Sequence, residues 1–360
     1  MKRKVVIIGA GFSAPIGIPL MRGFFAKMEE TYKDPCSGLG GHENSLSNNK
    51  INDKEEFRLV LERWTQWATG KCTQEADDLE AFCSYVSSDA NMRNSVLYCI
   101  ARLFEIRMHP LGNLGLRSGP WKSLYRQFAN DVGRCCDTIT VVTLNQDLLL
   151  DQAFLQEGYC PDYCLPKDTN LINEINVSQK KGDSLQLLKL HGSMNWLRCD
   201  NPACRLLTVK WQREGSLNCP GNWPTGPEQH EGHISKDNLH FLMVLPEHQK
   251  SAAPEDVWLG SVKSSVEAAF RQADEVFFLG YSLPETDEDM IRLMSSSKVQ
   301  CRHVCVVDRC YDAAQQSNLK NRYKDAASAG DALEFCLGDE GDIALYEKST
   351  WRQQLLAGCP

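Results

Sequence analysis

The sequence predicts an α/β fold in which helices cover a doubly wound, mostly parallel sheet, with an inserted helical subdomain and a small cysteine-containing module. Short apolar runs rich in valine and isoleucine alternate with segments of helical periodicity along most of the chain. The first run, at 5–8, leads directly into a glycine turn at 9–11. Five of the runs end in small or polar residues, and open α/β sheets bind their ligands beyond such strand ends.

Composition limits the classes of protein to which the chain can belong. Its 360 residues are 42% hydrophobic and 24% charged, which is typical of a globular protein with one large domain or two. A net charge of −8 argues against general nucleic-acid binding. No apolar run approaches the roughly 20 residues of a membrane span. The four apolar residues after the basic start are too few for a signal peptide, so we expect a cytoplasmic protein without membrane contact.

Cysteine is frequent, with 16 residues in the chain. Several cysteines lie within apolar segments, among them Cys99, Cys301, Cys305 and Cys336. Because there is no secretory signal, we expect most cysteines to be reduced and packed in the core.

The chain begins with a strand, a glycine turn and the expected start of a helix. Gly9 and Gly11 follow the strand at 5–8, and glycine there lets backbone N–H groups approach a phosphate. The next glycine, Gly17, is too far along for the dinucleotide fingerprint Gly-x-Gly-x-x-Gly. The turn by itself fits a nucleotide site and a plain strand–helix corner equally well. A first helix is expected to continue through 20–25.

An inserted helical subdomain is predicted at 31–130. The stretch 34–53 is rich in Gly, Ser and Asn and is expected to be a mobile loop. Helical periodicity follows at 55–67, 79–85 and 94–108. Trp64 and Trp67 are expected in the core of this insert rather than as a stacking platform.

The remaining strands are predicted by apolar runs at 138–143, 186–190, 240–245, 275–279, 303–307 and 333–336. Helices are expected from 148, at 254–273 and from 285. Three stretches of the chain, 1–30, 131–196 and 236–360, would then form one sheet domain. Residues 197–235 would form a small Cys/His module.

Polar or small side chains directly follow five of the predicted strands and are expected to meet at one edge of the sheet. They are Gly9 and Ser13, Asn145 and Asp147, His191, Gly280 and Ser282, and Asp308. Each also has a structural interpretation. Asn145 and Asp147 suit helix capping, His191 suits a satisfied core histidine, and Gly280 suits a chain reversal.

Four of these segments, in the same order, resemble the sirtuin-like NAD-binding domain, which has a Rossmann-like sheet. They are Gly9-Ala10-Gly11-Phe12-Ser13 with Gly17-Ile18-Pro19, Thr143-Leu144-Asn145-Gln146-Asp147, Leu190-His191-Gly192-Ser193, and Gly280-Tyr281-Ser282-Leu283-Pro284 with Asp287. The segments most resemble the divergent bacterial branch, whose members hydrolyse NAD in anti-phage defence. The resemblance spans the α/β parts of the chain and not the helical insert.

The resemblance implies a role for each site residue. Asn145 would hold the nicotinamide ribose or order the attacking water, and His191 would act as general base or as partner of a ribose hydroxyl. Asp147 would order its loop or support the developing charge. The remaining positions would bind the pyrophosphate and adenosine: Gly9, Ala10, Gly11, Phe12, Ser13, Gly280, Ser282 and Asp308.

The cysteine module resembles the zinc ribbon of sirtuin deacetylases. Cys199 and Cys204 have a spacing that zinc sites allow, but Cys219 has no nearby partner cysteine. A Cys3His zinc site that uses His230 or His233, and a degenerate ribbon without metal, both remain open.

Two departures from the deacylase branch favour water as the acceptor. The residues after Pro19 read Leu20-Met21-Arg22 where deacylases have Asp-Phe-Arg, and the substrate loop expected near Val244 is replaced by a different sequence. An NAD glycohydrolase that makes nicotinamide and ADP-ribose is therefore the first hypothesis. A protein deacylase, an ADP-ribosyltransferase and a non-catalytic NAD- or ADP-ribose-binding regulatory subunit are the alternatives. We also expect control by the loop at 34–53, by homo-oligomerisation or by a regulatory protein partner.

Overall fold

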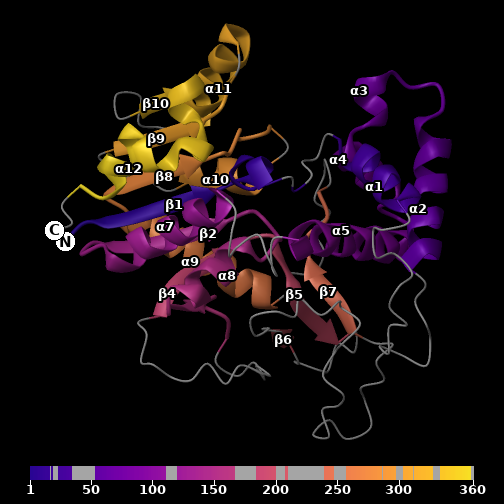
Figure 1. Ribbon diagram of the computed structural model, residues 1–360, viewed down its shortest axis with the longest axis horizontal. Coiled ribbons are helices and arrows are strands. Elements are labelled where there is room, and N and C mark those ends of the chain that lie inside the picture. Colours follow the sequence, from indigo (N-terminus) through magenta and orange to yellow (C-terminus); the bar gives the residue numbers. More distant parts are fainter. Residues whose placement is uncertain are drawn as a thin grey trace, which may run out of the picture.

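A computed structural model describes residues 1–16, 18, 23–34, 53–110, 120–166, 184–199, 207–209, 239–246, 257–285, 287–296, 303–310, 312–326 and 333–357. Its centre is a seven-stranded sheet in the order β10-β9-β8-β1-β2-β4-β3, in which every pair of neighbours is parallel (Figure 1). The strands are β1 (Arg3–Ile8), β2 (Thr138–Thr143), β3 (Cys160–Asp162), β4 (Ser184–Lys189), β8 (Glu275–Leu279), β9 (His303–Asp308) and β10 (Leu333–Leu337).

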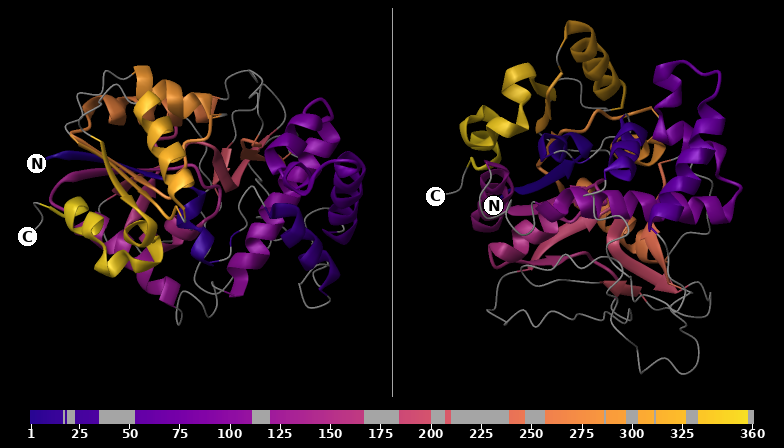
Figure 2. Two further views of the ribbon diagram at one scale, coloured as in Figure 1. Left: turned by 90° about the horizontal axis from the view of Figure 1, so that it is seen from above. Right: turned by 45° about the vertical axis from the view of Figure 1, so that its right-hand side comes forward.

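This strand order confirms the predicted fold class. Without the short edge strand β3, the order is that of a Rossmann-like doubly wound sheet, with β1 at its middle. The chain winds from β1 toward β4 and then returns to wind from β8 toward β10. Because crossovers between parallel strands are right-handed, the two halves place their helices on opposite faces (Figure 2). The strand order reverses between β1 and β8.

The helices form the two outer layers and a separate lobe. They are α1 (Phe24–Lys33), α2 (Asp53–Ala68), α3 (Thr73–Ala76), α4 (Leu79–Tyr85), α5 (Ala90–Pro110), α7 (Pro120–Arg134), α8 (Leu149–Gln156), α9 (Val257–Gln272), α10 (Glu288–Ser296), α11 (Ala313–Ala326) and α12 (Thr350–Leu355). The four helices α1, α2, α4 and α5 share a hydrophobic cluster of their own, distinct from the larger cluster around the sheet. Trp64 and Trp67 pack against the smaller cluster, as predicted, and Trp64 stacks on Phe25 with ring centroids 4.8 Å apart.

A second, three-stranded antiparallel sheet lies beside the first. It has the order β6-β5-β7 and consists of β5 (Gly192–Cys199), β6 (Leu207–Val209) and β7 (Leu239–Met243). The assignment of the run at 240–245 to the parallel sheet is therefore wrong. That run follows the predicted pattern, but β7 pairs with β5, whose Trp196 and Leu197 are buried. The boundary predicted at 197 falls within β5; the domain boundaries otherwise remain predictions.

The region after β1 also differs from the prediction. Two 3-10 turns, η1 (Ala10–Phe12) and η2 (Ala14–Ile16), follow the strand, and the first α-helix begins only at Phe24. Its N-cap residue, Gly23, has φ +82°, a left-handed conformation that favours glycine. The predicted helix through 20–25 is thus wrong at Gly23 and right at 24–25, while 20–22 and most of the loop predicted at 34–53 lie outside the described residues.

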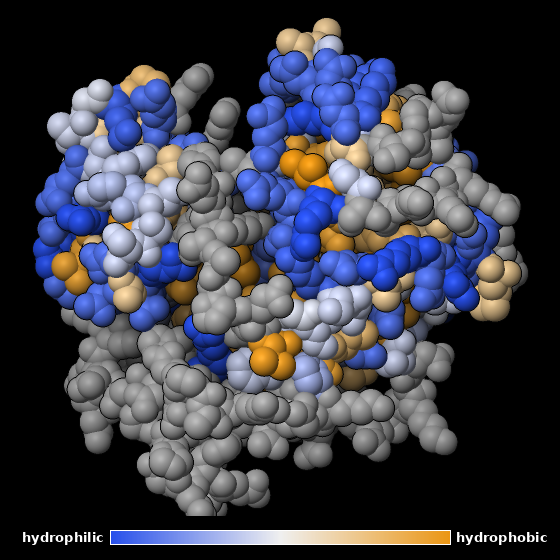
Figure 3. Space-filling view, turned by 180° about the vertical axis from the view of Figure 1, so that it is seen from behind, coloured by the Kyte–Doolittle hydropathy of each residue, from blue (hydrophilic) through white to orange (hydrophobic). Residues whose placement is uncertain are grey.

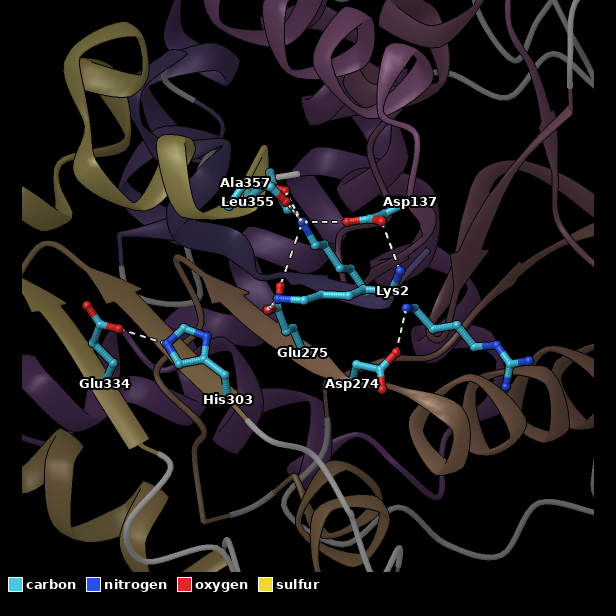
Figure 4. Close-up of polar contacts among 10 residues, drawn as sticks. Lys2, Asp137, Asp274, Glu275, His303, Glu334, Leu355 and Ala357 are labelled. Atoms are coloured by element: carbon cyan, nitrogen blue, oxygen red, sulfur yellow. Dashed lines mark hydrogen bonds and ion pairs between the residues drawn. The ribbon is translucent and has the colours of Figure 1, made fainter. Parts of the chain in front are cut away.

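The C-terminal helix α12 is anchored at the edge of the sheet where the parallel strands begin, which we call the amino edge. The buried Lys4 Nζ donates to the carbonyl oxygens of Leu355 at 2.6 Å and Ala357 at 3.2 Å, and it pairs with Asp137 at 3.0 Å (Figure 4). Arg352 of α12 pairs with Asp131 of α7 at 2.7 Å. The end of the chain is therefore held against both β1 and α7.

The face seen in Figure 3 is mostly hydrophilic, with small scattered hydrophobic patches. None of the described helices is long and apolar enough to cross a membrane. Cys99, Cys305 and Cys336 are buried and reduced, as predicted, whereas Cys135 is disulfide-bonded and Cys301 lies outside the described residues.

Candidate functional site

The carboxyl ends of the central strands are level with one another. Ile8 at the end of β1 is in register with Thr143 of β2 on one side and Leu279 of β8 on the other. Beyond these, Thr143 is in register with Lys189, and Leu279 with Val307. The polar residues that follow these strands therefore lie along one edge of the sheet, as predicted.

The turns after β1 and β8 pack directly against each other at the point where the strand order reverses. Gly9 N donates to Leu279 O at 3.0 Å, and Gly11 N donates to Gly280 O at 2.9 Å. A Cβ on Gly9 would lie 2.5 Å from Gly280 O, and a Cβ on Gly280, which has φ +61°, would lie 2.5 Å from Phe12 N. The glycines are required because the two backbones approach so closely.

This packing changes the interpretation of the glycine turn. Four of its N–H groups have backbone acceptors, because Phe12 N donates to Gly9 O and Ser13 N to Ala10 O, in addition to the two bonds of the glycines. Within the described residues, the N–H of the exposed Ala10 has no acceptor. The N–H groups of Gly9 and Gly11 are thus used within the fold, and that of Ala10 is the one left open to a phosphate among the described N–H groups of residues 9–13. Phosphate binding by residues 9–13 remains a prediction.

Ser13 joins the turn after β1 to the turn after β2. Its buried Oγ donates to Asp147 Oδ2 at 2.9 Å and accepts from Asn145 Nδ2 at 3.0 Å. Asn145 Nδ2 also donates to Gly9 O at 3.0 Å, and a carbonyl oxygen can only accept. These two bonds fix the orientation of the Asn145 amide. Within the described residues, its Oδ1 accepts no hydrogen bond and is left for a donor on a ligand.

Asp147 is buried and stabilises the contact between the turns after β1 and β2. Its Oδ1 accepts from Leu149 N at 3.0 Å, at the start of α8, and its Oδ2 accepts from Ser13. Burial raises the pKa of Asp147, although the positive charge of Lys189 and both hydrogen bonds lower it. Asp147 thus holds Ser13 and Leu149 N at once, although it lies one residue before Leu148, the N-cap of α8.

Tyr125 of α7 also contacts this junction, and no local sequence pattern points to it. Its OH donates to Phe12 O at 2.9 Å and lies 3.3 Å from Ser13 Oγ. Burial and the nearby Asp147 charge raise the pKa of Tyr125 well above its usual value, so the hydroxyl stays protonated and remains a donor.

His191 lies in the turn between β4 and β5, beside Asn145. Gly192, which follows it with φ +75°, has no room for a Cβ because Leu242 O would lie 2.0 Å away. The His191 carbonyl accepts from Val244 N at 2.9 Å and from Gln146 Nε2 at 3.2 Å. The imidazole is half-buried. The structure thus brings His191 next to the Asn145 loop, as predicted.

A buried ion pair lies under the same loop, and sequence reasoning missed it. Lys189 Nζ contacts Asp151 Oδ2 at 2.9 Å and donates to Asp147 O at 2.5 Å. Tyr163 OH donates to the other oxygen of Asp151 at 2.5 Å. The lysine sits at the end of an apolar strand, and only the three-dimensional fold shows that its partner comes from α8.

The motif from Gly280 to Asp287 is explained largely by local structure. Tyr281 OH donates to Asp287 Oδ2 at 2.6 Å, and Asp287 Oδ1 accepts from Met290 N in the first turn of α10. Ser282 is exposed, and Leu283 is a buried non-glycine residue with φ +47°. Ser282 is therefore open to a ligand, as is the exposed Glu285.

Asp308 lies two strands away from the glycine turn, at the end of β9. Burial raises the pKa of Asp308, and the Cys310 thiol donates to its Oδ1 at 3.7 Å. Its distance from Asn145 spans three strand spacings, about 14 Å. The two residues are thus far enough apart to meet opposite ends of an extended ligand.

The predicted zinc ligands are largely outside the described residues. Cys199 is the last residue of β5, whereas Cys204, Cys219, His230 and His233 are not described. In the part of the chain that is described, no group of three His, Cys, Asp or Glu residues is arranged to hold a metal ion.

Comparisons with known proteins give similarity of fold at low identity. No family model matches the chain, and no curated protein matches its sequence. A Sir2 homologue in complex with NAD matches with a TM-score of 0.42 and 15% identity, over 96% of this chain and 89% of that one. Sir2Tm bound to a propionylated peptide matches with a TM-score of 0.42 and 12% identity, over 99% and 94%. These values carry no conclusion about function, and the fold assignment rests on the strand order.

Proposed function

We propose that the chain is an NAD glycohydrolase that cleaves NAD to nicotinamide and ADP-ribose at the carboxyl edge of its sheet. The proposal rests on the four sirtuin-like motifs and on the position of their residues at one edge, where the strand order reverses. Asn145 and His191 would lie at the nicotinamide ribose. Ala10, Ser282 and Asp308 would lie toward the pyrophosphate and adenosine.

The reaction places modest demands on this site. As the bond between nicotinamide and ribose breaks, its electron pair leaves with neutral nicotinamide, and positive charge develops at the anomeric carbon. Water then forms the new carbon–oxygen bond and loses one proton. No acid is needed for the leaving group, so the site has to orient the ribose, hold a water and accept a proton. A histidine with a pKa near 6.5 can accept that proton at neutral pH.

The orientation of the Asn145 amide is the observation that carries the proposal. Gly9 O and Ser13 Oγ hold its Nδ2, so Oδ1 is the atom presented to a ligand. An amide oxygen accepts a hydrogen bond from water or a ribose hydroxyl without forming an ion pair with the cationic nicotinamide ring. In this proposal Ser13 and Asp147 are positioning residues, because both are buried and directed at Asn145 or its loop.

Nicotinamide release from NAD by the purified chain tests the proposal. We expect release without any added peptide, reduced at least 100-fold in Asn145→Ala and His191→Ala. Ser264→Ala is the matched control, since this exposed serine donates only to Gly260 O within α9. Turnover that requires an acyl-lysine peptide would replace the proposal with a protein deacylase. Modified protein as product would indicate an ADP-ribosyltransferase, and tight NAD binding without turnover a regulatory subunit.

We extend the proposal to a regulated effector of anti-phage defence, on the strength of the motif resemblance. Uncontrolled NAD loss would harm the host cell, so the activity has to be restrained until infection. NAD levels in phage-infected bacteria that carry the wild-type chain should fall, and they should stay constant with Asn145→Ala. Equal NAD loss in uninfected cells would contradict regulation by infection.

A further inference from the structure

The side chain of Gln146 links the loop of Asn145 to the small antiparallel sheet. Its Nε2 donates to Val244 O at 2.6 Å and to His191 O at 3.2 Å. Its own backbone oxygen accepts from Met194 N at 3.0 Å. A single residue thus bonds to the turn after β4, to β5 and to the segment after β7.

These contacts hold the backbone of His191 in place. The carbonyl of His191 accepts from both Gln146 Nε2 and Val244 N, so the imidazole is carried by a turn that is held from two directions. In the parallel sheet, the register of Thr143 with Lys189 fixes the strands but not the turns beyond them. Within the described residues, the Gln146 amide is the side-chain link between the turn that carries Asn145 and the turn that carries His191.

The Gln146 side chain can make these two bonds only as a hydrogen-bond donor. An amide NH2 has two hydrogens, and here both go to carbonyl oxygens, which only accept. A carboxylate at this position would place negative charge against two carbonyl dipoles, and a thioether would leave both carbonyls without this donor. Asn145 and His191 are neighbours across adjacent strands, where small displacements matter for a reaction that needs a water between two groups.

We infer that Gln146 is a positioning residue that sets the relation between Asn145 and His191. The inference rests on the proposed NAD glycohydrolase activity. It also makes Val244, directly after β7, part of the site through its backbone oxygen. A shift of the small sheet would thereby move the histidine relative to the asparagine.

Three variants test this assignment, with nicotinamide release as the readout. Gln146→Met, which keeps the length but has no donor, should lower kcat roughly 10- to 100-fold with a smaller change in KM for NAD. Gln146→Glu should be equally impaired at pH 8, and its activity relative to wild type should rise as pH falls to 6. A protonated carboxyl regains one donor, and the adjacent carbonyls favour the protonated form. Taking the ratio to wild type removes the titrations that both proteins share.

The control is Gln354→Met. Gln354 Nε2 also makes a side-chain hydrogen bond between distant elements, at 2.8 Å to Glu334 Oε1, but it does so at the amino edge of the sheet. We expect wild-type kcat in this variant. Wild-type kcat in Gln146→Met, or a ratio for Gln146→Glu that does not change with pH, would overturn the inference.

Hydrogen exchange separates this inference from the proposed function. If the wild-type chain releases no nicotinamide, the glycohydrolase proposal fails, and the role of Gln146 is decided by exchange at the amides of Met194 and Val244. Faster exchange there in Gln146→Met, but not in Gln354→Met, supports the link. Unchanged exchange at both amides overturns it.

Discussion

Ser13 and Asp147, which lie 134 residues apart in the sequence, are joined by a 2.9 Å hydrogen bond that connects the turns after β1 and β2. The bond is buried, and the same serine oxygen accepts from Asn145. The Ser13 hydroxyl therefore both joins the two turns and orients the amide of Asn145, a candidate catalytic residue. Substitutions here should change stability and activity together.

Ser13→Ala should lower both the free energy of unfolding and nicotinamide release. The variant leaves Asp147 and Asn145 each without one buried partner, which costs about 1–3 kcal/mol. Urea unfolding measures the loss, and Ser264→Ala, whose hydroxyl bonds only within α9, should stay within about 0.5 kcal/mol of wild type. Equal stability of Ser13→Ala and wild type would mean that the junction is not formed in solution.

Asp147→Asn should also be destabilising, although it is isosteric. Both oxygens of Asp147 accept from donors, Leu149 N and Ser13 Oγ, so one of them would face the amide NH2 of asparagine. We expect a loss of about 1–3 kcal/mol in urea unfolding. A variant as stable as wild type would contradict the assigned hydrogen-bond directions.

Much of the sheet and its functional edge was predictable from local pattern. Buried parallel strands are short continuous apolar runs, and those at 138–143, 275–279 and 303–307 match β2, β8 and β9 within a residue. Parallel strands also place their carboxyl ends together, so residues such as Asn145 and Gly280 were expected at one edge. Both steps depend only on periodicity and on the geometry of a parallel sheet.

The remaining features depend on contacts that sequence pattern does not encode. The apolar run of β7 is compatible with a parallel and with an antiparallel sheet. It lies in the antiparallel sheet because it pairs with β5. Gly9 and Gly11 predict a phosphate site, but the sequence does not reveal that a Cβ on either residue would collide with Gly280. Tyr125, Lys189 and Gln146 lie in ordinary helix, strand and loop contexts. Their partners come from elements that are distant in the chain.

Gly280→Ala should prevent the turns after β1 and β8 from packing. Its φ is +61°, and a Cβ would lie 2.5 Å from the backbone nitrogen of Phe12, which cannot move without displacing η1. We expect a large fall in thermal stability or failure to fold. Gly260→Ala in α9 is the matched control, because a Cβ there meets nothing within 4 Å. It should be neutral or stabilising by up to about 1 kcal/mol. Equal melting temperatures for the two variants would contradict the close approach.

Lys189→Met should be more destabilising than the combination of Lys189→Met with Asp151→Asn. The single variant leaves a buried carboxylate without its cation, which costs about 3–5 kcal/mol. In the double variant the charge is gone and the asparagine oxygen still accepts from Tyr163 OH. Denaturant unfolding of both proteins and of Asp151→Asn completes the cycle. A double variant less stable than Lys189→Met would show that Asp151 does not carry the buried charge.

The pair of His303 and Glu334 should make stability depend on pH at the amino edge of the sheet. Glu334 accepts from Gln354 of α12 at 2.8 Å and contacts His303 Nε2 at 2.7 Å (Figure 4), and these two bonds lower the pKa of Glu334. A lowered carboxyl pKa stabilises the fold above the unfolded value, near 4.3, and this stabilisation is lost as pH falls through the lower folded value. The difference in stability between wild type and Glu334→Gln should therefore shrink as pH falls from about 5 to about 3. Gln354→Met removes the larger of the two causes and should show a weaker dependence on pH. A difference between wild type and Glu334→Gln that persists unchanged to about pH 3 would contradict the lowered pKa.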